Sequence, residues 1–301
     1  MSFKYLVASS LFAKQALAWW GTGHLMTARV AYDRLIATDN EEVIELVEEQ
    51  LDVLRSFVHM EQNHPFVECA TFADFIKNAG FNDLSTWHYV DTPFFDEGYT
   101  TEVHDDPSNV VWAIDQMHKQ IVDPVGTIYG PVNPTLPVDL SFGRSFNMRL
   151  LIHYFGDIHQ PLHSVSRYTE NYPNGDAGGN LFGIPASGPD GGVTNLHAVW
   201  DSVAYAYADF IDQPLTDDSW EFLGREAFKI QMSHPFDSFD LAELTRPESE
   251  WYTETLELAE TVVYPGAIEN EPLSEEYIQN AAEIAKRQIA KGGYRLADEL
   301  I

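Results

Sequence analysis

The sequence contains very little cysteine and little positive charge. Cys69 is the only cysteine among 301 residues, which excludes an intramolecular disulfide. Lys and Arg number 17 against 47 Asp and Glu, and the formal net charge is −30. A broad basic surface for nucleic acid is therefore excluded, so a polyanion would need a few Lys or Arg side chains or bound metal. The acidity by itself is typical of a secreted protein kept in solution by self-repulsion.

Long hydrophobic runs are also missing. The apolar stretch 5–13 follows Lys4 and is far too short to span a bilayer. It is followed by Ala-Leu-Ala at 16–18, the small-x-small form that signal peptidase cleaves. We therefore predict a secretory signal peptide over 1–18 and one mature domain over 19–301. The protein is expected to be secreted, or delivered to a periplasm or vacuolar lumen, without stable membrane association.

Helical periodicity dominates the rest of the chain, and strand-like alternation is scarce. With 45% hydrophobic residues, the chain has enough apolar material for one large core. We predict an all-α fold, a single multi-helix domain with long active-site loops. The expected helices cover 24–36, 40–57, 65–77, 108–122, 140–159, 195–211, 219–230, 241–263 and 274–300.

Two long segments interrupt this pattern. Residues 123–137 are rich in Pro and Gly, which prevent a continuous helix, and 167–194 contain two Gly-rich stretches. Loops of this length in a compact domain are more often functional than idle. We therefore expect the chemistry of the protein to lie near loops and helix ends.

The spacing of His and Asp is the strongest signal of function. His153 and Asp157 are four residues apart, as are His197 and Asp201, so each pair shares one face of a helix. His163 follows shortly after the first pair. Imidazole and carboxylate groups suit zinc, and a catalytic zinc keeps an open position for water. The pattern predicts a metal site, although one such pair alone is more often a surface pair.

Other candidates are ambiguous from the residues alone. Asp74 lies in an apolar helical stripe, where it is either a ligand, a helix-end carboxylate or part of a buried ion pair. His88 lies among aromatic residues and taken alone is an ordinary packed histidine. After cleavage, the amine and carbonyl of Trp19 are able to chelate a metal with His24, or Trp19 simply begins a packed helix.

The chain resembles the single-strand-specific zinc nucleases of fungi and plants, a family related to bacterial zinc phospholipase C. The resemblance covers nearly all of the mature chain and rests on order, residue types and gaps together. The matching motifs are WWGTGH (19–24), ATFAD (70–74), WHYVD (87–91), HYFGDIHQPLH (153–163), DAGGN (176–180), NLHAVWD (195–201) and GYRLA (293–297).

This resemblance implies three zinc ions and assigns their ligands. The first zinc is expected on Asp74, His88, His153 and Asp157. The second is expected on the amine and carbonyl of Trp19, on His24 and on Asp157 as a shared bridge. The third is expected on His163, His197 and Asp201. The phospholipase branch usually has Glu in place of Asp201, so this residue favours the nuclease branch.

The resemblance also implies roles beside the metals. Lys77 matches a lysine on the phosphate side, Asp91 a carboxylate near the metal-bound water, and Tyr89 an aromatic that stacks on a nucleobase. The implied function is a secreted, monomeric endonuclease that hydrolyses single-stranded DNA and RNA to products with 5′-phosphates. The resemblance also allows a 3′-nucleotidase activity beside the nuclease activity. The six positive charges of three zinc ions would reconcile an acidic protein with a polyanionic substrate.

Two alternatives remain open: a zinc phospholipase C acting on phospholipids, and a secreted zinc-binding protein without catalysis. The chain also departs from the family in lacking disulfides and in a longer 123–137 loop. His159 is expected to support the site or lie on the surface. Cys69 is expected to pack as a small buried hydrophobe. Five further histidines are expected to be exposed: His59, His64, His104, His118 and His234.

Overall fold

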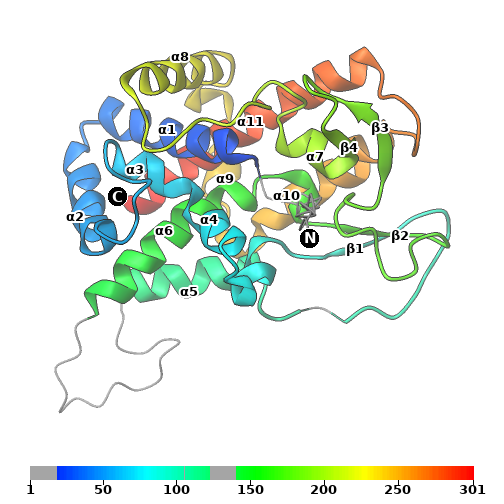
Figure 1. The fold of residues 1–301 in the computed structure, drawn as a ribbon. Coiled ribbons are helices and arrows are strands. Elements are labelled where there is room, and N and C mark those ends of the chain that lie inside the picture. Colours follow the sequence, from blue (N-terminus) through cyan, green and yellow to red (C-terminus); the bar gives the residue numbers. More distant parts are fainter. Residues whose placement is uncertain (1–18, 105, 123–139) are drawn as a thin grey trace, which may run out of the picture.

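The computed structural model describes residues 19–104, 106–122 and 140–301. The predicted signal peptide and the 123–137 loop therefore lie outside the described residues. Helices dominate the described part, as predicted (Figure 1). The α-helices are α1 Gly21–Ala37, α2 Glu41–Arg55, α3 Pro65–Glu68, α4 Phe72–Asn78, α5 Val110–Val122, α6 Ser141–Asp157, α7 Leu196–Asp201, α8 Asp217–Ser233, α9 Leu241–Leu244, α10 Trp251–Leu258 and α11 Glu275–Leu300.

Shorter helical turns connect these helices. Five are 3-10 helices: η1 Cys69–Thr71, η2 Asn82–His88, η3 Pro161–His163, η4 Phe236–Ser238 and η5 Glu248–Glu250. The sixth, η6 Ala259–Val263, is a π-helix that continues α10. Two of these turns, η2 and η3, end on the histidines His88 and His163. A short turn thus fixes the direction of each of these two side chains.

Helix α6 lies at the centre of the fold. Helices α1, α2, α5 and α11 all pack against it, and α1 also runs along α11 (Figure 1). The second half of α6 is buried on all sides, from Asn147 to Asp157. A helix that is covered all round belongs to the interior of a large domain. The central position of α6 brings its C-terminal end, with His153 and Asp157, into the middle of the molecule.

The sequence explains where several helices begin. The side chains of Asn195, Thr216 and Ser274 accept hydrogen bonds from backbone N–H groups in the first turns of α7, α8 and α11. Such caps satisfy donors that have no partner inside the helix. Helix α7 therefore starts directly before His197, which places this side chain in its first turn.

Two expected long helices are shorter in the structure. The predicted helix 195–211 ends at Asp201, because Val203, Ala204 and Tyr205 have left-handed backbone with φ of +55°, +48° and +73°. The predicted helix 241–263 is divided into α9 and α10, since Pro247 cannot continue a helix. The apolar periodicity correctly predicted helical structure in both segments, but it did not reveal where the helices end inside them.

Four short strands were not predicted. β1 (Pro93–Phe95) pairs in parallel with β2 (Ser166–Tyr168), and β3 (Gly183–Ser187) pairs in antiparallel with β4 (Val193–Asn195). Most of these strand residues fall in the predicted loop 167–194. The first pair continues into two backbone hydrogen bonds, from Val90 N to the His163 carbonyl and from Ser166 N to the Thr92 carbonyl. The pairing thereby holds residues 88–91 next to the turn that carries His163.

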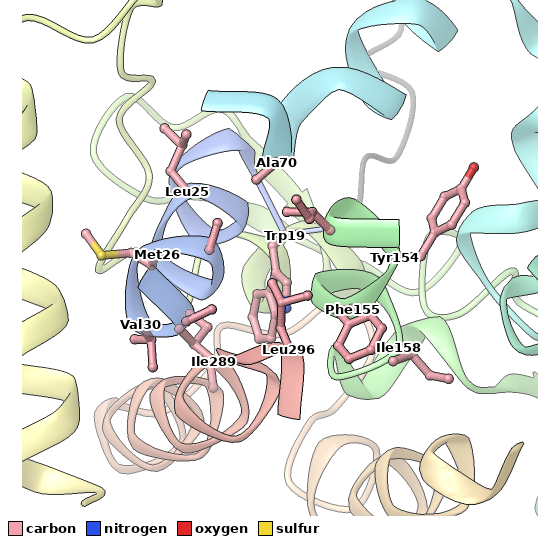
Figure 2. Packing of buried hydrophobic residues seen from close by; sticks show 14 of the residues in the cluster. Trp19, Leu25, Met26, Val30, Ala70, Tyr154, Phe155, Ile158, Ile289 and Leu296 are labelled. Atoms are coloured by element: carbon pink, nitrogen blue, oxygen red, sulfur yellow. The ribbon is translucent and has the colours of Figure 1, made fainter. Parts of the chain in front are cut away.

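The core is one contiguous cluster of apolar side chains. Figure 2 shows Trp19 among side chains from α1, α6 and α11, with Phe155 and Leu296 nearby. Trp19 is fully buried. The first described residue is thus part of the core, where it lies beside α6. Within 19–104, 106–122 and 140–301, no helix has the length and apolar character needed to cross a membrane.

Candidate metal centre

Eight His and Asp side chains from six elements meet near the end of α6. Each of these residues is between 0% and 5% exposed. They come from α1, α4, η2, α6, η3 and α7: His24, Asp74, His88, His153, Asp157, His163, His197 and Asp201. Burial of so many ionisable groups is unfavourable unless they are paired or bind a metal.

Asp157 lies at the centre of the first part of this cluster. Its Oδ2 atom is 3.0 Å from His88 Nδ1 and 3.2 Å from His153 Nε2. Its Oδ1 atom is 3.5 Å from His24 Nε2. The two oxygens of one carboxylate thus face different histidines. This is the arrangement that a bridge between two cations requires.

Asp74 faces the same histidines from the other side. Its carboxylate oxygens lie 3.8 Å from His88 Nδ1 and 3.9 Å from both His153 Nε2 and His24 Nε2. These distances are too long for hydrogen bonds and leave a gap between the groups. These side chains form two sets, and within each set the ligand atoms lie within 4.8 Å of one another. One set is His24, His153 and Asp157, and the other is Asp74, His88 and His153.

His163, His197 and Asp201 form a third group, whose ligand atoms also lie within 4.8 Å of one another. Asp201 Oδ2 is 3.3 Å from His197 Nε2, and Asp201 Oδ1 is 4.0 Å from His163 Nε2. His163 Nδ1 is also 3.7 Å from Asp157 Oδ1. The third group is therefore adjacent to the first part of the cluster.

Backbone carbonyls fix the orientation of three of these rings. In each ring Nδ1–H donates a hydrogen bond of 2.6–2.7 Å, so that Nε2 points into the cluster. Such a bond fixes the tautomer and aims the other nitrogen at a metal. The pairs are His153 with Ala70, His163 with His88, and His197 with Gly178.

Several buried atoms that face the cluster have no hydrogen-bond partner. They are His24 Nε2, Asp74 Oδ1, Asp157 Oδ1 and His163 Nε2. Buried polar atoms are almost always hydrogen-bonded, so a group of unsatisfied atoms in one place needs an explanation. All of them are zinc-ligand atom types. The donor set therefore fits bound metal ions.

The pKa values of three of these histidines agree with a role as neutral ligands, whereas for His153 the nearby Asp157 and Asp74 outweigh burial and raise the pKa. Burial lowers the pKa of His24, His88 and His163, which favours the uncharged ring. Burial alone would raise the pKa of Asp157, but its interactions with the imidazoles of His153 and His88, which include hydrogen bonds, hold it well below the usual range. Asp157 is thus ionised, the form in which a carboxylate binds a metal.

Asp201 differs from Asp157. Burial raises the pKa of Asp201 well above the usual range. An adjacent cation would favour the ionised form instead. A charged Asp201 therefore depends on a cation in the third group more strongly than Asp157 depends on one.

The other predicted site residues line a cleft of about 130 Å³ beside the cluster. Lys77, Tyr89 and Asp91 share this cleft with His88, His163 and His197. Asp91 reaches solvent, yet its partial desolvation and then the charges of Asp176 and Asp106 raise its pKa to about 6. The structure therefore brings Lys77, Tyr89 and Asp91 together with the histidines of two groups.

Gly156 lets Trp19 and His24 pack closely against α6, because it has no side chain. A Cβ atom on Gly156 would lie 2.6 Å from His24 Nδ1 and 3.6 Å from Trp19 Cδ1. In addition, Trp20 N donates a 2.9 Å hydrogen bond to the carbonyl of Asp201. The start of α1 thus lies close to both Asp157 and α7.

Sequence reasoning missed three residues that shape this region: Gly156, Gly178 and Gln160. Gly178 has φ of +60°, a Cβ there would lie 2.3 Å from the Leu162 carbonyl, and its own carbonyl holds His197. In the sequence, the only indication that these three residues shape the site is their position beside candidate ligands in HYFGDIHQPLH and DAGGN. Nothing in these motifs shows which neighbour each residue meets.

Some expectations for the remaining side chains were wrong. His234 is buried and pairs with Glu283, and His118 and His64 are partly buried, His64 by stacking on Trp220. His159 is buried too, which excludes the surface alternative, and it accepts a hydrogen bond from Arg295. Helix packing covers these positions, which local spacing does not reveal. His59 and His104 are exposed and Cys69 is buried, as expected.

Comparison with known proteins decides the family. The model of the S1/P1 nuclease family matches residues 19–301. The chain belongs to the S1/P1 nuclease family. This makes it an enzyme of the nuclease class, a phosphodiester hydrolase, and confirms the resemblance and the all-α fold.

Individual members of the S1/P1 nuclease family resemble the chain at moderate identity. Endonuclease 3 of Arabidopsis thaliana is 25% identical over 292 residues, covering 95% of this chain and 88% of that protein. Nuclease S1 of Aspergillus oryzae is 30% identical over 173 residues, covering 50% of this chain and 51% of that protein. Nuclease P1 of Penicillium citrinum is 30% identical over 161 residues, covering 50% and 55%.

Proposed function

We propose that this chain is a secreted zinc-dependent endonuclease that hydrolyses single-stranded DNA and RNA and leaves 5′-phosphate products. The observation that carries the proposal is the convergence of unsatisfied, buried His nitrogens and carboxylate oxygens beside an open cleft. Three zinc ions account for the three groups of ligand atoms.

The ligand groups divide as follows. Asp74, His88, His153 and Asp157 would hold one ion, and His163, His197 and Asp201 would hold another. His24, Asp157 and the backbone amine and carbonyl of Trp19 would hold a third. His153 lies within reach of two ligand groups, and its hydrogen-bond distance to His88 (3.2 Å between Nε2 and Nδ1) favours the ion on Asp74.

Bound zinc would supply an activated water and offset negative charge on the phosphoryl oxygens. Asp91, at the cleft, would orient the attacking water or accept its proton. The Lys77 ammonium pairs with a phosphoryl oxygen as negative charge develops there. Tyr89 stacks on a base, which requires an unstacked nucleotide and therefore favours single strands.

The proposal of secretion rests on the N-terminal residues. Residues 1–18 have the form of a signal peptide, and the family match starts at residue 19. Cleavage after Ala18 frees the amine of Trp19. Because a peptide nitrogen is a poor ligand compared with an amine, processing and metal binding are coupled in this proposal.

Hydrolysis of single-stranded DNA by the chain that begins at Trp19 tests the function. Cleavage should stop with a chelator, return with zinc and leave 5′-phosphate ends. Double-stranded DNA of the same sequence should be cut more slowly. If zinc-loaded protein leaves DNA and RNA intact but cleaves phospholipids or 3′-nucleotides, the proposed substrate is wrong. If it hydrolyses none of these, the proposed activity is wrong.

Variants of the ligands test the site separately. His153→Ala and Asp157→Asn should each lose bound zinc and should each lower the activity by more than about 100-fold. Loss of a residue that only supports a ligand typically lowers metal affinity or activity by about 10- to 100-fold, and loss of a ligand itself should cost more. His59→Ala and Asp237→Asn are matched controls, because both side chains are exposed. Full activity in either ligand variant would refute the assigned roles.

A further inference from the structure

A second cluster of possible ligands lies on other elements than the candidate metal centre. It consists of His118 on α5, Glu248 on η5 and Glu299 in the last turn of α11. One ligand atom from each lies within 4.8 Å of the others. The three residues are far apart in the sequence and meet only because α5, η5 and the end of α11 pack together.

The imidazole of His118 contacts both carboxylates. Its Nδ1 atom is 3.2 Å from Glu248 Oε1, and it is in close contact with Glu299 Oε1. The His118 side chain is 38% exposed, Glu248 24% and Glu299 19%. The cluster is therefore preorganised by protein on one side and open to solvent on the other.

Two carboxylates in contact repel each other unless a proton or a cation lies between them. Both carboxylates face the same imidazole nitrogen, Nδ1 of His118. Among the described residues, His118 is the only basic side chain that pairs with either glutamate. Two carboxylates thus share one basic partner, and a bound divalent cation would offset their mutual repulsion.

We propose that His118, Glu248 and Glu299 form an additional binding site for a divalent transition-metal ion such as zinc. Imidazole with carboxylate oxygens suits zinc, whereas calcium and magnesium prefer oxygen ligands alone. The ligand atoms of the three residues lie within 4.8 Å of one another, close enough to reach one ion.

Hollows on both sides leave room for entry of an ion and for water to complete its coordination. His118 and Glu299 line a cavity of about 410 Å³, and Glu248 lines a second one of about 770 Å³. A metal here would connect the C-terminal end of α11 to α5 and η5. Its function is structural, because the site shares no residue with the candidate metal centre.

The number of zinc ions bound to each chain tests this proposal. Zinc-loaded wild-type enzyme and the variants Glu299→Gln and His118→Ala are dialysed against one low micromolar free zinc concentration and analysed for metal. The exposed residues Glu276, also on α11, and His59 provide the matched controls Glu276→Gln and His59→Ala. We expect both cluster variants to bind one ion fewer than wild type, and both controls to match wild type.

Activity separates this site from the proposed nuclease site. Hydrolysis of single-stranded DNA should stay within twofold of wild type in Glu299→Gln, and the metal content tests the additional site even if the wild type does not hydrolyse DNA. Glu299→Gln preserves the shape of the side chain and decides the outcome if His118→Ala does not fold. Equal zinc content in wild type and Glu299→Gln would overturn the additional site.

Discussion

Gln160 links two of the candidate zinc-binding segments through its amide group. Its Nε2 donates a 2.6 Å hydrogen bond to Asp201 Oδ1, and its Oε1 accepts one of 2.5 Å from Leu162 N. The residue is fully buried. It therefore fixes the Asp201 carboxylate relative to the turn that carries His163, and leaves Oδ2 directed at His197.

The first prediction concerns this amide. Gln160→Ala should weaken zinc binding at the His163, His197 and Asp201 group by about 10- to 100-fold, the usual effect of removing a residue that orients a ligand. Chelator titration of the activity and metal analysis measure the loss. Gln279→Ala, an exposed glutamine on α11, is the control. Unchanged zinc affinity would show that Asp201 needs no such support.

A methyl group at Gly156 should displace His24. In Gly156→Ala the new Cβ would lie 2.6 Å from His24 Nδ1, closer than real contacts allow. Overpacking of this kind typically costs about 1–3 kcal/mol in the free energy of unfolding. We expect both this loss, measured by denaturant unfolding, and reduced DNA hydrolysis.

Gly21→Ala is the matched control for this variant, because its Cβ meets only Thr71 Cγ2 at an ordinary 3.6 Å. If Gly156→Ala matched Gly21→Ala in stability and activity, the close packing of His24 on α6 would be unimportant for the site.

The state of the Trp19 amine should determine activity. Chains that begin at Trp19 and at Ala18 differ by one residue, yet in the longer chain the Trp19 nitrogen is an amide. We expect the longer chain to bind one zinc ion fewer and to hydrolyse single-stranded DNA at least about tenfold more slowly, in the range of a lost ligand interaction. Metal analysis and initial rates of both proteins measure this. Equal rates would remove Trp19 from the ligand set.

The pH dependence of hydrolysis should reflect Asp91. Its pKa is raised to about 6, so it loses the ionised form as the pH falls through that value. A group that accepts a proton is active only when ionised, and therefore the rate should fall below about pH 6. Asp91→Asn should lower the rate at pH 7 by about 10²–10⁴-fold and abolish this limb of the profile.

This pH experiment needs metal analysis at each pH, because zinc loss also lowers the rate. Asp83→Asn is the control, since Asp83 is exposed on η2. An acid limb that persists unchanged in Asp91→Asn would assign it to another group.

The helices could be predicted largely because the signal is local. Apolar spacing identified α1, α2, α5, α6, α8 and α11 to within a few residues. The same rule failed after Asp201, where three successive residues adopt left-handed backbone. No apolar pattern encodes such a turn, because it is favoured by the packing around it.

The residue types of the candidate site could also be predicted from the sequence. The two His-x-x-x-Asp pairs are properties of the sequence itself. Their meeting in space is not. The Ala70 carbonyl orients His153 across 83 positions of sequence, and the His88 carbonyl orients His163 across 75.

The sequence by itself determined the helical class, the acidity and the set of side chains able to bind metal, because these follow from composition and short-range spacing. The tertiary structure alone decided which candidate ligands lie together, through the close packing of His24 on Gly156 and the hydrogen bond from Gln160 to Asp201. It also brought His118, Glu248 and Glu299 together. These relationships depend on contacts between distant helices, and local spacing contains no information about them.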